Sequence, residues 1–173
     1  MDDVSELRLQ RVHPKLAGLI RQMAEQLALE GISIRVTQGL RTWEEQDALY
    51  AKGRTTPPLG EKYEVTKAPG GSSWHNFGLA VDCVPMMPLG PDWNETHPVW
   101  KRMLAVGLTL GLEEGAGWRT FKDYPHFEMI GSLPEKPNDY VHSAYAEGGI
   151  PAVWTAAGLY VPGPILSAGP NTA

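Results

Sequence analysis

Two short stretches of this chain carry side chains that can bind a metal. The first reads SWHNFGLAVD and contains His75 and Asp82, and the second reads DYPHFE and contains Asp123 and His126. Two imidazoles and one carboxylate, with a fourth position left for water, are a common ligand set of catalytic zinc. A carboxylate outside that set, here Asp123, can act as a general base. If the two stretches meet in space, they form the site of a zinc hydrolase.

Each stretch also has a structural interpretation. Asp82 follows an apolar run, where its charge could be compensated by a metal ion, by a buried arginine or by hydrogen bonds at a strand end. His126 could be a core or surface histidine, and Cys83 fits a small core residue better than a nucleophile. No ligand partner stands at suitable spacing from the other three histidines, which are His13, His97 and His142.

Composition narrows the class of protein. The 173 residues are 42% hydrophobic, which suits one domain with a core, and a lone cysteine cannot form an internal disulfide. The net charge is -5 and the 15 Lys and Arg form no basic cluster, so nucleic acid is not an expected partner. The N-terminus is acidic without an apolar leader, and no apolar run approaches the roughly 18 residues of a membrane span. We expect synthesis in the cytoplasm without a signal peptide and no stable membrane association.

Hydrophobic periodicity and turn residues predict the elements that must position these side chains. Thr42 and Glu45 form a capping-box pattern at the start of one helix, and Thr96 could cap another. We expect helices over 14–30, 42–53 and 96–111, strands over 32–37, 78–84 and around 127–130, long loops over 54–73 and 85–94, and one or two short helices within 139–158. The expected domain covers 1–160, with a motif-bearing core over 12–130, a C-terminal extension over 131–160 and a disordered tail over 161–173.

The pattern Ser73-x-His75-x-x-Gly78-x-Ala80-x-Asp82, followed by Asp123-x-x-His126, resembles the two-part signature of the M15 family of zinc peptidases. The similarity extends upstream to the QGLRT segment and downstream to a Gly-Trp pair, and it covers roughly residues 12–130. It implies an α+β fold in a single domain, a small antiparallel sheet flanked by helices like that of Hedgehog and D-Ala-D-Ala peptidase domains.

The resemblance also implies roles for individual residues. It makes His75, Asp82 and His126 the ligands of Zn²⁺. Asp123 becomes the general base, where some relatives have Glu, and Arg41 the arginine that steadies the carbonyl oxygen. Ser73 and Gln38 correspond to polar residues near the substrate.

Two observations leave parts of this assignment open. From the residues alone, Arg41 could be a surface partner of Glu44 or Glu45. Many relatives have Trp-Gly-Gly-Asp-Trp before the second motif, whereas this chain has EGAGW ending at Trp118. One wall of the substrate cleft therefore differs.

The family hydrolyses peptidoglycan stem peptides, and the QGLRT segment is most similar to that of endolysin-type L-alanyl-D-glutamate endopeptidases. We expect that activity in a monomer that acts on the cell wall after phage-type release. The first alternative is a D-alanyl-D-alanine carboxypeptidase or dipeptidase, in which Arg54 or Lys67 would bind the terminal carboxylate. The second is a non-catalytic, zinc-stabilised wall-binding module on the same scaffold. The C-terminal extension contains three aromatic residues that could bind sugars or could pack on the domain, namely Tyr140, Tyr145 and Trp154.

Overall fold

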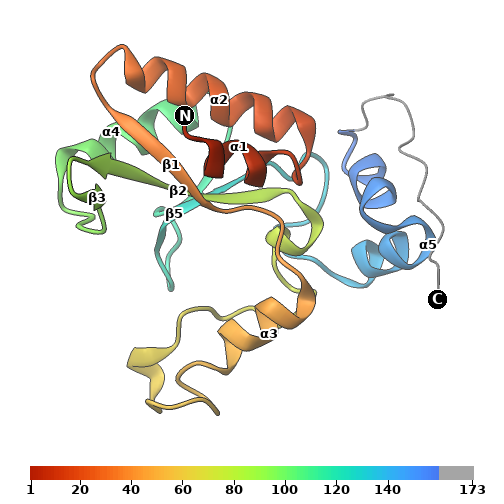
Figure 1. Cartoon of the computed structure of the whole chain (residues 1–173). Coiled ribbons are helices and arrows are strands. Elements are labelled where there is room, and N and C mark those ends of the chain that lie inside the picture. The colour runs from red at the N-terminus through yellow and green to blue at the C-terminus, as the bar shows by residue number, and fades with distance from the viewer. Residues whose placement is uncertain (160–173) are drawn as a thin grey trace.

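An antiparallel sheet with helices around it forms the centre of the molecule (Figure 1). The computed structural model describes residues 1–159. Its strands lie in the order β1-β2-β5-β4, and the short β3 pairs with the far end of β2. The elements along the chain are α1 (Asp3–Leu9), α2 (Pro14–Ala28), β1 (Ser33–Gln38), α3 (Trp43–Ala51), the 3-10 turns η1 (Glu61–Tyr63) and η2 (Trp74–Phe77), β2 (Ala80–Met87), β3 (Gly90–Pro91), α4 (Pro98–Thr109), β4 (Glu113–Gly115), β5 (Asp123–Glu128) and α5 (Asp139–Ala156).

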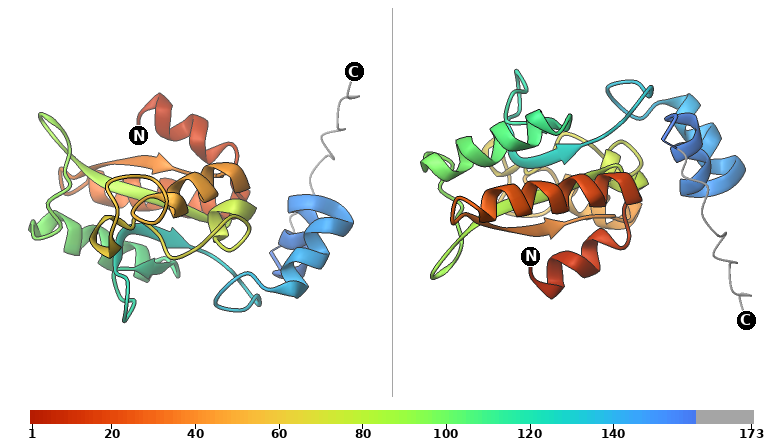
Figure 2. Two further views of the ribbon diagram at one scale, coloured as in Figure 1. Left: turned by 90° about the horizontal axis from the view of Figure 1, so that it is seen from below. Right: turned by 90° about the horizontal axis from the view of Figure 1, so that it is seen from above.

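The main core lies between the sheet and the helices α2 and α4, which run side by side across it (Figure 2). Most of the apolar stripe predicted for α2 is buried, with Ile20, Met23 and Leu27 fully inaccessible, but Leu29 follows the last residue of the helix and is exposed. Alternate residues of β1 face the same core, as the period of a half-buried strand requires. The expected α+β fold with an antiparallel sheet is confirmed.

The short elements differ from the expectation. Helix α1 was not expected, because its seven residues bury only Ser5 and Leu9 and show no apolar stripe. It packs beside β1, where the hydroxyl of Ser5 accepts a hydrogen bond from Val36 N. The strands β3 and β4 and the two 3-10 turns were not expected either, and β2 continues past Val84 to Met87 within the predicted loop.

The start of α4 was also predicted wrongly. The helix begins at Pro98 with His97 in the N-cap position, because the hydroxyl of Thr96 donates instead to Asn94 Oδ1 at 2.7 Å. Proline suits the first turn of a helix, since its missing N–H would have no intrahelical partner there.

The C-terminal helix α5 forms a second, smaller core against η2 and the start of β2. It is kinked at Gly148 and Gly149, so it consists of the two short helices that were one form of the expectation. The indole of Trp154 donates to Phe77 O at 2.8 Å, and Tyr145 stacks on Trp43. These two aromatic residues therefore pack on the domain, whereas the predicted tail over 161–173 lies outside the described residues.

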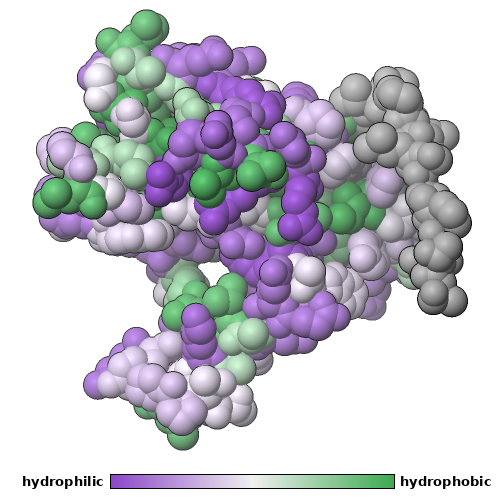
Figure 3. Space-filling model, viewed as in Figure 1, coloured by the Kyte–Doolittle hydropathy of each residue, from purple (hydrophilic) through white to green (hydrophobic). Residues whose placement is uncertain are grey.

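The surface in Figure 3 is mainly hydrophilic, with small and separate apolar groups. Within residues 1–159, none of the helices combines the length and apolar character that crossing a membrane requires.

Candidate metal centre

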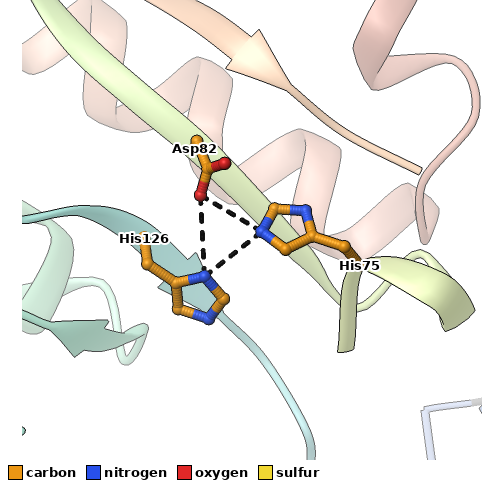
Figure 4. A group of neighbouring side chains, drawn as sticks. All are labelled: His75, Asp82 and His126. Atoms are coloured by element: carbon orange, nitrogen blue, oxygen red, sulfur yellow. Dashed lines mark hydrogen bonds and ion pairs between the residues drawn. The ribbon is translucent and has the colours of Figure 1, made fainter. Parts of the chain in front are cut away.

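Three side chains from two strands and a 3-10 turn converge on one point (Figure 4). Asp82 on β2 lies directly opposite His126 on β5, and directly paired residues of antiparallel strands project to the same face. His75 lies on η2, which ends at Gly78. That glycine has a φ of 66°, a left-handed conformation that turns the chain from η2 into β2. The two predicted stretches therefore meet as expected.

The distances among the three side chains fit a tetrahedral metal. His75 Nε2 lies 3.1 Å from Asp82 Oδ1 and 3.2 Å from His126 Nδ1, and the third side of the triangle measures 3.6 Å. Ligands of tetrahedral zinc with bonds of about 2.0–2.2 Å lie about 3.3–3.6 Å apart. The triangle therefore needs little adjustment to hold such an ion.

The hydrogen bonds behind the two imidazoles determine which nitrogens face the centre. His75 Nδ1 lies 2.9 Å from Gly39 O, and His126 Nε2 lies 2.8 Å from Glu128 Oε2. Both oxygens are acceptors, so in the neutral imidazoles these ring nitrogens carry the protons and the opposite nitrogens present lone pairs. Three acceptor atoms then face one another, which is favourable only with a cation between them. This outer pair of hydrogen bonds is the usual support of metal-binding histidines.

The pKa of His126 also shows that positive charge is favoured at this centre. Burial would lower its pKa, but hydrogen bonds and charge interactions with Asp82 and Glu128 outweigh burial and raise the pKa to about 10. Burial would likewise raise the pKa of Asp82, but the two imidazoles hold it well below its usual range. Without a metal, a proton on the histidines would neutralise the centre, so metal and proton compete for it.

Arg41 belongs to this centre and is not a surface residue. Its side chain is only 10% exposed, with Nη2 3.3 Å from Asp82 Oδ2 and Nη1 2.6 Å from Gln46 Oε1. The alternative pairing of Arg41 with the first turn of α3 is wrong, because Glu45 instead accepts from Thr42 N in the predicted capping box. A permanent positive charge therefore lies beside Asp82 in the candidate metal centre.

Asp123 lies at the start of β5, on the strand that carries His126. Strand β4 approaches closely here: a Cβ on Gly115 would lie 2.5 Å from Asp123 O, so only glycine fits. Burial raises the pKa of Asp123, and repulsion from Asp82 adds to the rise, while the cationic side chains around it oppose the rise. A carboxyl group with a raised pKa beside a metal centre is well suited to take and return a proton.

The two predicted substrate residues lie at the margins of the centre. Gln38 pairs with Asp82 across the β1–β2 ladder, so its side chain projects to the same face of the sheet. Ser73 is the N-cap of η2, and its backbone N–H donates to Asn76 Oδ1 at 3.4 Å. Ser73 thus helps to shape the turn that carries His75, and contact of either residue with substrate stays a prediction.

Three further residues of the site had no role assigned to them from the sequence. Glu128 orients His126, Gln46 contacts Arg41, and the Trp118 ring lies 4.9 Å from the His126 ring. The one available signal was that Glu128 follows His126 by two residues in a strand and so shares its face.

The remaining histidines and the cysteine have structural surroundings, as expected. Cys83 is fully buried, and burial raises the pKa of its thiol. Each of the other histidines places a ring nitrogen within 2.7–2.8 Å of an oxygen elsewhere in the fold, in the pairs His13 with Leu159 O, His97 with Asp92 and His142 with Gly71 O.

Comparison with known proteins places the chain in a family. Residues 9–111 match the family model described as VanY: D-alanyl-D-alanine carboxypeptidase. The chain belongs to this family. The match includes Arg41, His75 and Asp82 but ends before β5, so Asp123 and His126 are supported by the geometry above. The predicted membership in the M15 peptidases is thereby confirmed.

Individual proteins resemble this VanY-family chain in sequence or in fold. It is 38% identical over 131 residues to the peptidoglycan L-alanyl-D-glutamate endopeptidase CwlK of Bacillus subtilis, covering 69% of this chain and 74% of CwlK. The crystal structure of the L-Ala D-Glu endopeptidase ChiX of Serratia marcescens superposes with a TM-score of 0.53 at 28% identity, covering 75% of this chain and 88% of ChiX. A vancomycin-resistance D,D-pentapeptidase VanY variant, solved with Zn(II), superposes with a TM-score of 0.50 at 20% identity over 68% and 71% of the two chains, which shows a shared fold.

Proposed function

We propose that this protein is a zinc peptidase that hydrolyses peptidoglycan stem peptides, and that it cleaves the bond between L-alanine and D-glutamate. The observation that carries the proposal is the convergence of three acceptor atoms, from His75, Asp82 and His126, with Asp123 at the start of the strand that carries His126. The names of the relatives CwlK and ChiX support the choice of bond.

The proposed mechanism assigns each side chain one task. Zinc held by the His-Asp-His set would supply a Lewis acid that polarises a peptide carbonyl and lowers the pKa of water. Asp123 takes the proton of the attacking water and returns it to the leaving amine. Arg41 keeps its charge at neutral pH and lies beside the centre, where it can stabilise the oxyanion that develops on the carbonyl oxygen.

The long loop argues against the carboxypeptidase alternative. A carboxypeptidase needs a cation that is free to bind the terminal carboxylate, and Arg54 and Lys67 were the candidates. Arg54 instead pairs with Glu64 and donates to Tyr50 O at 2.6 Å, and Lys67 lies 2.8 Å from the same Glu64. Lys67 also lies 3.5 Å from Glu61, so both cations are already paired with carboxylates of the loop.

The ligand count argues against a purely structural zinc in a wall-binding module. Structural zinc sites are closed by four protein ligands, whereas catalytic sites leave one position open. Among residues 1–159, the metal-binding group consists of three side chains only. A general base and an arginine beside an open position would have no use in a module that only binds.

Mass analysis of muropeptides digested with and without a chelator tests the function. We expect release of the peptide from L-alanine onward, and no product when the chelator is present. Loss of a single D-alanine would instead identify a carboxypeptidase. Tight wall binding without any product would identify a module.

A substrate in the cell wall requires that the protein leave the cytoplasm. We infer that it reaches the wall by phage-type release and acts there as a monomer. Light scattering of the purified protein and fractionation of expressing cells, with and without a membrane lesion, test the two parts of this inference separately.

A further inference from the structure

Gln46 is a fully buried polar residue that bridges Arg41 and the long loop. It lies on α3, and its Oε1 accepts a hydrogen bond from Arg41 Nη1 at 2.6 Å. Its Nε2 donates to Ala68 O at 2.7 Å and lies 3.4 Å from Thr66 Oγ1. One amide thus accepts from the arginine of the metal centre and donates to the backbone of a loop 22 residues away in sequence.

Only an amide of this length satisfies both partners. The guanidinium offers donors only and the Ala68 carbonyl only accepts, so the bridging group must accept at one end and donate at the other. An apolar side chain would remove the hydrogen bond that each of these partly buried partners makes with Gln46, which is costly. Glutamate could accept from Arg41 but would place a carboxylate against Ala68 O.

The position of Arg41 depends on this bridge. The arginine precedes α3 on the segment that leaves the sheet, and α3 projects with the long loop below the sheet (Figure 1). Apart from Gln46, the guanidinium contacts one described protein group, Asp82, at the longer distance of 3.3 Å. A flexible side chain with one long contact would sample several rotamers, whereas two contacts define one orientation.

We propose that Gln46 is a positioning residue, which holds the guanidinium of Arg41 at the reaction centre and couples it to the loop over 54–72. The proposal rests on the proposed function in one respect, the role of Arg41 in hydrolysis. It assigns to Gln46 no contact with substrate.

A neighbouring residue provides a matched control. Asp47 also anchors the loop from α3, since its Oδ1 accepts from Gly70 N at 2.7 Å, but among the described residues the Arg41 side chain makes its hydrogen bonds to Gln46 and Asp82 and not to Asp47. Replacing Asp47 with alanine should therefore loosen the loop without releasing the arginine. Replacing Gln46 with methionine keeps the side-chain volume and removes both hydrogen bonds.

The test is a double-mutant cycle on the zinc-loaded protein with the muropeptide that the wild type cleaves. We expect Gln46→Met to lower kcat about 10- to 100-fold with little change in KM, the range for a lost hydrogen bond to a charged group. Arg41→Ala should cost more, and Gln46→Met should add almost nothing in the Arg41→Ala background. Asp47→Ala should stay near wild type. Additive losses, or an Asp47→Ala loss as large as that of Gln46→Met, would overturn the proposal.

A second measurement does not depend on activity. The side-chain Nε–Hε resonance of Arg41, assigned through Arg41→Lys, should shift or broaden in Gln46→Met and stay unchanged in Asp47→Ala. An unchanged resonance in Gln46→Met would refute the positioning role. If the wild type cleaves no muropeptide, the proposed function fails, and this resonance still decides whether Gln46 orients the arginine.

Discussion

At the residue scale, the placement of protons determines what the centre can bind. Gly39 O and Glu128 each accept a hydrogen bond from the outer N–H of an imidazole. The inner nitrogens of the neutral rings then face the carboxylate of Asp82 as acceptors. A site that only stabilised the fold would alternate donors and acceptors here. With both imidazoles neutral, the three described side chains offer no donor inside the triangle, so the centre needs a metal or a proton there, and the fixed outer hydrogen bonds are those of metal-binding histidines.

Replacing Asp123 with asparagine should separate chemistry from metal binding. Asparagine has nearly the same shape but cannot take a proton, so we expect kcat to fall about 10²- to 10⁴-fold. Zinc content, measured by elemental analysis, should stay at one per chain because Asp123 is outside the ligand triangle. His75→Ala should lose both zinc and activity. Full activity of Asp123→Asn would exclude Asp123 as the base.

Replacing Glu128 with alanine should weaken zinc binding without removing a ligand. The outer N–H of His126 would lose its buried acceptor, and such changes typically cost about 10- to 100-fold in metal affinity. Competition with a chromophoric chelator measures the affinity. Glu128→Gln keeps an acceptor oxygen and should cost less, so equal losses in the two variants would contradict the assigned role.

The three candidate ligands could be predicted from residue types and order, whereas the residues that hold the centre in place could not. His75, Asp82 and His126 stand in two recognisable motifs, and strand pairing brings them together. The role of Gln46 could not be predicted, because its partners Arg41 and Ala68 lie 5 residues before it and 22 residues after it, and only tertiary contacts bring them to the same amide.

At the element scale, long segments could be predicted from the sequence and short segments could not. Helix α2 and strand β1 were predicted well because their periodic apolar faces extend over several turns or alternations. The elements α1, β3 and β4 have seven residues or fewer and no such pattern. They form because neighbouring elements supply hydrogen-bond partners. For example, Val36 N of β1 donates to the hydroxyl of Ser5 on α1.

The junction of α2 and α5 should make stability depend on pH. His13 caps α2 by accepting from Lys15 N, and its Nε2 donates to Leu159 O just after α5. Burial lowers its pKa, with the charge of Lys15 adding and the hydrogen bond to Leu159 opposing. A base with a lowered pKa in the folded state contributes stability above its unfolded pKa of about 6.5. That contribution is lost as pH falls below this value.

We therefore expect His13→Asn to gain stability relative to the wild type as pH falls from 7 to 5, because the titration of His126, whose raised pKa acts in the opposite direction, is common to both proteins. Asparagine can still cap the helix but does not titrate. Chemical denaturation of both proteins in excess chelator measures this, because metal release then contributes to neither curve. Parallel curves for the two proteins would show that His13 does not titrate with unfolding.

At the scale of the whole molecule, net charge governs the encounter with the cell wall. The chain carries -5 overall, and its Lys and Arg form no run that could make a basic face. Several of the cations that the fold brings near the surface are paired with carboxylates, among them Arg21, Arg35 and Arg102. Attraction to anionic wall polymers should therefore be small.

Sedimentation with insoluble peptidoglycan should show weak association that changes little between low and high salt. Electrostatic attraction would be screened by salt, whereas recognition of a peptide in the cleft would persist. Exposed Tyr140 is the aromatic residue of α5 still free to contact sugars, since Tyr145 and Trp154 pack inward. Tyr140→Ala should pellet like the wild type. Strong pelleting that salt or Tyr140→Ala abolishes would show that the surface outside the cleft binds the wall, and that the affinity for substrate is not set by the metal centre alone.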